Sequence, residues 1–200
     1  MPDAVLQERS PLHGPAVPGR FGARGNVVGV SIEERTMALA SVVARRDQRD
    51  ALGRKVAERY GLQLPDGPRR STAGSVTFAG VAPGQWVAST EGAADFVTGV
   101  RSDLGSLAAV ADQSDSRLVV RLSGPRVRDV LVKGLAVDLH PRAFKLGDVA
   151  VTLVAHIGVQ IDMLDDAPTY QLAAARSMAG SFWSWLTASA AEFGYDVVTK

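Results

Sequence analysis

The sequence has 200 residues, a net charge of +1 at pH 7, 46% hydrophobic residues and 22% charged residues. This is a globular composition, which excludes a wholly disordered chain and a coiled coil, and a chain of this length buries roughly 70% of its unfolded surface. No apolar run reaches the ~18 residues of a membrane-spanning helix, and the near-neutral charge gives no reason to expect a membrane or nucleic acid as a partner.

The absence of cysteine from the sequence excludes a disulfide framework, a thiolate metal site, an iron–sulfur cluster and a cysteine nucleophile. The first twelve residues include Asp3, Glu8 and Arg9 and lack the apolar segment of a secretory signal. We therefore expect a cytoplasmic protein.

Residues 1–25 differ in composition from the rest of the chain, because prolines alternate there with glycines. Such a stretch does not form a helix and has little apolar surface to bury. It is either a disordered tail or an extended arm that becomes ordered on a partner subunit. The side chains that such an arm could dock are Leu6, Leu12, Val17 and Phe21.

The hydrophobic pattern of residues 26–111 predicts a first α+β module. Apolar runs predict strands at 27–32, 37–43, 75–79, 85–89 and 107–111. A helix is expected from an Asp47 cap to a stop at Gly61, and a second at 96–104 before Gly105. From residue 37 the order is strand, helix, strand, strand, helix, strand, which is the split βαβ or ferredoxin-like unit.

Residues 112–200 show a similar pattern. Strands are expected at 118–122, 149–155, 159–163, 169–173 and 195–198, and helices at 124–134 and 178–193. The sequence therefore predicts an α+β protein with two ferredoxin-like (βαββαβ) modules, 26–111 and 112–200, or with both in one compact domain.

Motifs of catalysis and cofactor binding are missing from the sequence. It has no glycine-rich dinucleotide fingerprint after a strand, no P-loop and no nucleophile elbow. His13, His140 and His156 lack metal-ligand spacing, and His156 is expected to be a structural residue at the end of a strand. We expect no catalytic, cofactor-binding or metal-binding residue in this chain.

Residues 117–145 carry an excess of positive charge, with seven basic residues and two acidic ones. This region is either a solvated face or a docking surface for an acidic partner or anionic ligand. Its candidate contact residues are Arg126, Arg128 and Arg142.

Two tryptophans in the expected helix 178–193 receive different interpretations. Trp185 shares the buried stripe with Phe182, whereas Trp183 lies about 100° from Phe182, at the edge of the stripe. Trp183 is therefore a candidate exposed contact anchor.

Several strings of the sequence are similar to known families. Residues 111–131, ADQSDSRLVVRLSGPRVRDVL, resemble the D-x-S, strand and glycine segment of the aminomethyltransferase (T-protein) superfamily. DLHPRAF at 138–144, LVAHI at 153–157 and SFWSWL at 181–186 resemble the gamma-subunit family of heterotetrameric sarcosine oxidases. SPL at 10–12 and GQW at 84–86 fit the same family.

The resemblance implies a T-protein-like fold and a structural, non-catalytic role in a four-subunit flavoenzyme. That complex demethylates sarcosine oxidatively to glycine, hydrogen peroxide and formaldehyde or 5,10-methylenetetrahydrofolate. The implied partners are the alpha, beta and delta subunits. FAD, FMN, NAD, zinc and tetrahydrofolate are expected on those subunits.

An alternative function remains, a stand-alone tetrahydrofolate-binding or aminomethyltransferase-like protein. Where aminomethyltransferases carry a Gly-Gly-x-x-Asp-Asp segment with the catalytic acid, residues 156–161 here read HIGVQI, followed by Asp162. General acid–base catalysis needs a carboxylate aimed at the ligand, and Asp162 does not obviously take that place.

Overall fold

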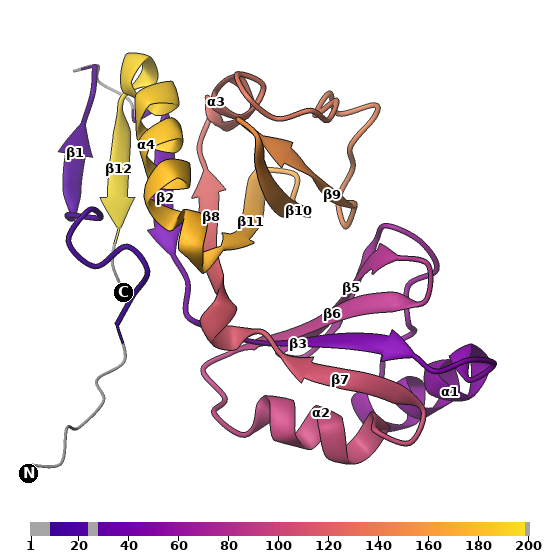
Figure 1. Ribbon diagram of the computed structural model, residues 1–200. Coiled ribbons are helices and arrows are strands. Elements are labelled where there is room, and N and C mark those ends of the chain that lie inside the picture. Colours follow the sequence, from indigo (N-terminus) through magenta and orange to yellow (C-terminus); the bar gives the residue numbers. More distant parts are fainter. Residues whose placement is uncertain (1–8, 24–27, 199–200) are drawn as a thin grey trace, which may run out of the picture.

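The structure is a computed structural model that describes residues 9–23 and 28–198. It contains two β-sheets, each with helices packed on one face (Figure 1). The larger sheet has seven strands in the order β1-β12-β2-β8-β11-β10-β9, and the smaller has five in the order β4-β5-β6-β3-β7.

The seven-stranded sheet contains β1 (Gly19–Phe21), β2 (Val30–Glu34), β8 (Arg117–Ser123), β9 (Val149–Val154), β10 (Ile157–Asp165), β11 (Thr169–Ala175) and β12 (Tyr195–Val198). The five-stranded sheet contains β3 (Met37–Ala44), β4 (Arg70–Ala73), β5 (Val76–Ala82), β6 (Gln85–Glu91) and β7 (Ala108–Asp112). The helices are α1 (Arg49–Tyr60), α2 (Phe96–Leu104), α3 (Val127–Leu131) and α4 (Ala179–Ala190), with short 3-10 turns η1 (Ser114–Ser116), η2 (Arg176–Met178) and η3 (Ala191–Phe193).

The five-stranded sheet confirms the ferredoxin-like prediction from residue 37 onward. The strands β5-β6-β3-β7 lie in that order and are antiparallel throughout. Leu52 of α1, and Val97 and Val100 of α2, pack with Phe78 and Trp86 of the sheet in one core. β4 is an additional edge strand that the loop-like composition of residues 65–70 did not indicate.

The ends of α1 show one correct prediction and one wrong one. The helix ends at Gly61, whose left-handed backbone (φ 68°) suits a glycine. The expected Asp47 cap is wrong, because Gln48 occupies the cap position and makes no side-chain capping bond. Asp47 itself lies in a turn with a φ of 61°.

The seven-stranded sheet departs from a simple βαββαβ unit at β2. The strands β12, β8, β11 and β10 keep the ferredoxin-like order, but β2 is inserted between β12 and β8. It pairs parallel to β12 and antiparallel to β8. The strand expected at residues 27–32 in the first module is observed as Val30–Glu34 and belongs to the seven-stranded sheet, and residue 27 lies outside the described residues. The chain passes from the seven-stranded sheet to the five-stranded sheet at residues 35–36, and the first module therefore does not begin at residue 26. The chain returns to the seven-stranded sheet at residues 113–116.

Helices α3 and α4 pack on one face of the seven-stranded sheet. Phe182 and Leu186 of α4 and Val130 of α3 are fully buried together with Ile161 and Tyr170 of the sheet. The expected helix at 124–134 is shorter in the structure, at five residues.

Residues 9–23, the described part of the N-terminal region, pack against the rest of the same chain. Leu12 is 1% exposed in the core of the seven-stranded module, and the Ser10 hydroxyl donates to the Glu34 carboxylate at 2.6–2.7 Å. Phe21 of β1 stacks on Tyr195 with 5.5 Å between ring centroids. The expectation that Leu12 docks on a partner is therefore wrong.

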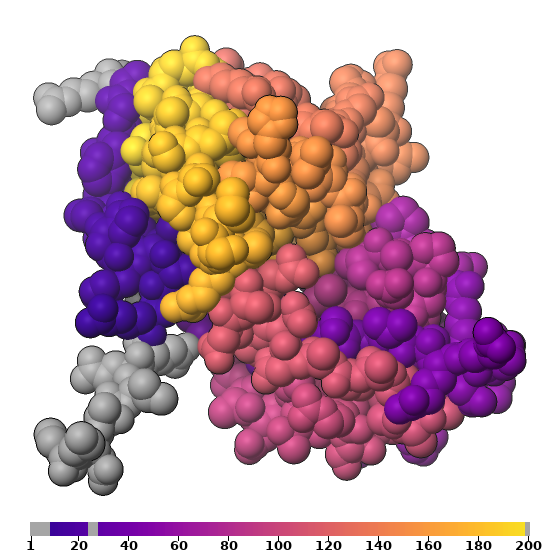
Figure 2. All heavy atoms as spheres, viewed as in Figure 1, coloured from indigo at the N-terminus to yellow at the C-terminus, as the bar shows by residue number. Residues whose placement is uncertain are grey.

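The two modules meet along one border (Figure 2). The Arg70 N–H donates to the Gly147 carbonyl and the Val149 N–H donates to the Pro68 carbonyl, both at 2.8 Å. Arg69 and Asp148 form an ion pair at 2.5 Å across the same border. The segment before β4 is thus tied to the start of β9.

Candidate functional site

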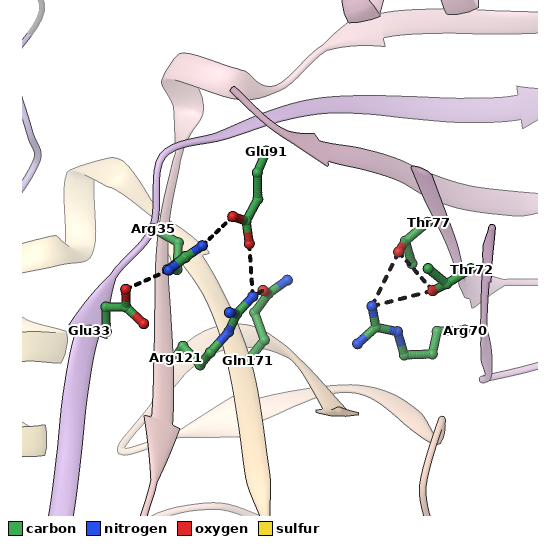
Figure 3. Close-up of polar contacts among 8 residues, drawn as sticks. All are labelled: Glu33, Arg35, Arg70, Thr72, Thr77, Glu91, Arg121 and Gln171. Atoms are coloured by element: carbon green, nitrogen blue, oxygen red, sulfur yellow. Dashed lines mark hydrogen bonds and ion pairs between the residues drawn. The ribbon is translucent and has the colours of Figure 1, made fainter. Parts of the chain in front are cut away.

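A network of charged side chains lies where the chain crosses between the sheets (Figure 3). Its members, called the junction network below, are Glu33, Arg35, Glu91, Arg121 and Gln171. Arg35 follows β2 and is 8% exposed; it forms ion pairs with Glu33 at 2.5 Å and with Glu91 at the end of β6. The other Glu91 oxygen pairs with Arg121 of β8 at 3.0 Å.

The electrostatics of the junction network favour the charged forms of Arg35 and Glu91. Burial alone would lower the pKa of Arg35, but hydrogen bonds and charges from Glu33 and Glu91 outweigh burial and raise this pKa. Burial would raise the pKa of Glu91, but Arg35 and Arg121 outweigh it and lower that pKa. The carboxylate of Glu91 therefore serves as a charged link between the two sheets.

A second polar cluster lies between the modules around Arg70 and Asp162. Arg70 of β4 donates to Thr77 Oγ1 at 3.2 Å and to Thr72 Oγ1 at 3.5 Å. Asp162 of β10 is 3% exposed and accepts a hydrogen bond from Gln160 Nε2 at 2.8 Å. Burial raises the pKa of Asp162 to about 6, opposed by the Gln160 hydrogen bond and by attraction to Arg70. The enclosed carboxyl of Asp162 is not placed to reach a substrate in bulk solvent.

A cleft of about 610 Å³ opens beside the junction network. It is lined by residues 9–11, by the crossing segment 34–37, and by parts of β6, β8, η1 and η2. Three of its charged groups bond to neighbours in the chain: Glu34 accepts from Ser10, Glu91 pairs with Arg35, and Arg176 donates to the Arg9 carbonyl. These bonds hold the N-terminal segment against the crossing.

Two of the predicted subunit contacts are core residues of this chain. Trp183 is 8% exposed and packs in the same core as Leu12, so the prediction of an exposed anchor is wrong for Trp183. Trp185, expected in the core, is half-buried and lies 5.9 Å from the Phe182 ring centroid. Leu6 lies outside the described residues.

The other predicted contacts come from three separate elements. Phe21 on the edge strand β1 is 38% exposed. Arg126 is exposed before α3, with its guanidinium 4.5 Å from the Phe193 ring centroid, whereas Arg128 is half-buried and donates to the Tyr170 hydroxyl at 3.0 Å. Arg142 is exposed in the loop before β9.

The histidines do not gather in the part of the chain that the structure covers. His13 and His140 are exposed, and so is His156, in the two-residue turn between β9 and β10 with a φ of 70°. The expectation of a structural strand-end histidine at 156 is therefore wrong. Among residues 9–23 and 28–198, no group of three His, Cys, Asp or Glu side chains could hold a metal ion. No helix there is long and apolar enough to cross a membrane.

Sequence reasoning missed the junction network. Arg121 interrupts the apolar run LVVRL of β8, which is the one local signal of a cation facing the second sheet. Glu91 is the last residue of β6 and Arg35 follows β2, and neither gave such a signal.

The two-module architecture places the chain in a structural class, the aminomethyltransferase-like folds. The glycine cleavage system aminomethyltransferase T from Bartonella henselae superposes with a TM-score of 0.62 and 14% identity, covering 90% of this chain and 58% of that chain. A chain of the heterotetrameric sarcosine oxidase from Corynebacterium sp. U-96, solved with pyrrole 2-carboxylate, superposes with a TM-score of 0.77 and 23% identity. That match covers 93% of this chain and 96% of the other.

Sequence comparison narrows the class to one family. The model of the "Sarcosine oxidase, gamma subunit family" matches residues 45–192. The sarcosine oxidase subunit gamma of Corynebacterium sp. (strain P-1) is 32% identical over 184 residues, covering 88% of each chain. The chain belongs to the sarcosine oxidase gamma subunit family.

Proposed function

We propose that this chain is the non-catalytic gamma subunit of a cytoplasmic heterotetrameric sarcosine oxidase, which demethylates sarcosine oxidatively to glycine. The observation that carries the proposal is the family match, which extends over nearly the whole chain rather than over one module. The partners are then the alpha, beta and delta subunits. FAD, FMN, NAD, zinc and tetrahydrofolate are then held by those subunits.

The chemistry of the buried charges supports a structural role. Glu91 forms ion pairs with Arg35 and with Arg121 of β8, and the buried Asp162 accepts a hydrogen bond from Gln160. The ion pairs of Glu91 with Arg35 and Arg121 fix the relative position of the two modules, which is what a rigid assembly subunit requires. Phe21, Arg126 and Arg142 remain candidate contacts, because each is exposed in the isolated chain.

The test is purification of the tagged chain from its native host, followed by mass spectrometry and a visible absorption spectrum. We expect three further proteins and flavin absorbance in the eluate. A colourless chain that elutes alone would contradict the proposal. Calorimetric titration of that isolated chain with tetrahydrofolate would then test the stand-alone alternative, since a bound ligand also raises the melting temperature.

A further inference from the structure

β9 forms the edge of the seven-stranded sheet at the end opposite β1 (Figure 1). Its six residues, VAVTLV, include no charge, no proline and no glycine. Val151 is 61% exposed and Leu153 is 52% exposed, more than most large hydrophobic residues in the described chain. Both side chains lie on the same face, because residues two apart in a strand point the same way.

The main chain of β9 also has open groups along its outer side. The two-residue turn 155–156 closes the hairpin, so Val154 pairs with Ile157, and the N–H and C=O groups of 150, 152 and 154 point toward β10. Those of 149, 151 and 153 point outward, as shown by the bonds from the Val149 N–H to Pro68 and from the Ala136 N–H to Leu153. Between these two bonds, the N–H and C=O of Val151 have no hydrogen-bond partner within the described chain.

Proteins usually protect such edges with charges, prolines, bulges or very short strands. The opposite edge strand, β1, is only three residues long and contains Arg20. β9 has none of these protections in its own sequence, and segments of the same chain cover its two ends through the isolated bridges Arg69–Asp148 and Leu135–Val154. The outer side of residues 150–152, between those bridges, is therefore the part that is open to pairing with another chain.

The loop that leads into β9 supplies a charge argument for the partner. Asp148 is neutralised by its ion pair with Arg69 at 2.5 Å, whereas Asp138 accepts only a backbone hydrogen bond, from the His140 N–H at 2.8 Å, and stays a single negative charge against two cations. Arg142 and Lys145 are exposed in the same loop and make no ion pair with the described residues. The surroundings of the β9 edge therefore favour an acidic partner.

We infer that the open part of the outer edge of β9, residues 150–152, binds a short extended segment of a neighbouring subunit of the oxidase. The main chain of that segment pairs with Val151, its aliphatic side chains cover Val151 and Leu153, and flanking acidic residues face Arg142 and Lys145. The inference rests on the proposed function, because the partner is one of the proposed subunits.

The test compares tagged wild-type chain with three variants in the native host. Val151→Lys places a charge on the apolar surface, and Val151→Pro removes only an N–H that points outward, a position at which an edge strand tolerates proline. Val43→Lys is the matched control, because Val43 is 38% exposed on β3 of the other module. Circular dichroism and the melting temperature of each purified chain establish that it is folded.

We expect both Val151 variants to recover at least about tenfold less of the flavin-containing subunits than the wild type, and Val43→Lys to recover as much as the wild type. Equal recovery by all four chains would overturn the β9 inference and leave the proposed function intact. A wild-type chain that recovers no flavoprotein would overturn both.

Self-association is the competing occupant. Analytical ultracentrifugation of the isolated wild-type chain is expected to show a monomer. A dimer that Val151→Lys abolishes would show that a second copy covers the edge and would overturn the inference. If Val151→Pro lowers the melting temperature, Leu153→Lys replaces it, since that side chain is half exposed and its outward N–H stays in place.

Discussion

Substitution of Glu91 by glutamine tests whether the junction network ties the modules together. Glu91 forms ion pairs with both Arg35 and Arg121, and the variant keeps the shape of the side chain but loses its charge. Hydrogen bonds to charged groups contribute about 1.5–3 kcal/mol each, and solvent screens those of exposed groups. Because 42% of the Glu91 side chain is exposed, we take the lower end of that range, about 1.5 kcal/mol, for each of the two ion pairs and expect a total loss of ~2–3 kcal/mol.

The assay is urea unfolding at pH 7 with thermal unfolding beside it. A loss of this size corresponds to a fall in melting temperature of about 5–10 °C for a chain of this length. The control is Glu34→Gln, which changes a carboxylate in the same cleft that bonds to the Ser10 hydroxyl. We expect less than about 1 kcal/mol there, because the donor is uncharged.

The pH dependence gives a second check on Glu91. Its pKa is lowered in the folded state, so its stabilisation is present above the ordinary value of 4.5 and is lost as the pH falls through the folded-state value. The difference between wild type and Glu91→Gln should therefore shrink in acid. If Glu91→Gln and Glu34→Gln lose the same free energy of unfolding at pH 7, the junction network does not link the modules.

Three further predictions, two of them with a control substitution, test the packing and electrostatics of the fold. Burial raises the pKa of Asp162 from 3.8 to about 6, so the stability that its protonated form contributes is lost as the pH rises through 6. In urea unfolding between pH 4 and 8, the free energy of unfolding of Asp162→Asn should therefore rise by up to about 3 kcal/mol relative to that of the wild type. Parallel pH profiles of the two proteins would contradict the burial of Asp162. Gly134→Ala should destabilise the protein by about 1–3 kcal/mol, because the added Cβ would lie 2.6 Å from the indole nitrogen of Trp185. Gly180→Ala is the control, because a Cβ at this position in α4 meets open space and the substitution should raise the melting temperature. Leu12→Ala should lose about 2–5 kcal/mol, while Val17→Ala, at 56% exposure, should lose less than about 0.5; equal losses would mean that residue 12 is not in the core.

The five-stranded module was predictable because its signals are local. A glycine that adopts a left-handed conformation ends α1 at Gly61, and the helical spacing of Val97, Val100 and Leu104 matches the buried face of α2. The placement of β2 was not predictable, since alternation along Val30–Glu34 shows that one face is buried but does not show which sheet it joins. Pairing with β12 depends on residues more than 160 positions away.

The contact residues were harder to predict than the elements. Helical spacing alone placed Trp183 at the edge of a buried stripe, but α4 packs into a core that also contains Leu12 from the N-terminal region. The proline- and glycine-rich composition of the N-terminal region gave no sign that Leu12 is a core residue. Arg126 and Arg142, in contrast, are exposed as expected for a charged surface, because long charged side chains are rarely buried without a partner.

The insertion of β2 between β8 and β12 has a consequence for synthesis on the ribosome. The strands of the five-stranded module lie between residues 37 and 112, with β3 and β7 side by side, so this part of the chain contains all its strand partners once residue 112 has emerged. β2 emerges earlier, yet its neighbours β8 and β12 are made only after that module. Since domains fold from the N-terminus during translation, we expect the five-stranded module to fold before β2 is paired, and β12 then to complete the pairing of β1 and β2 in the seven-stranded sheet.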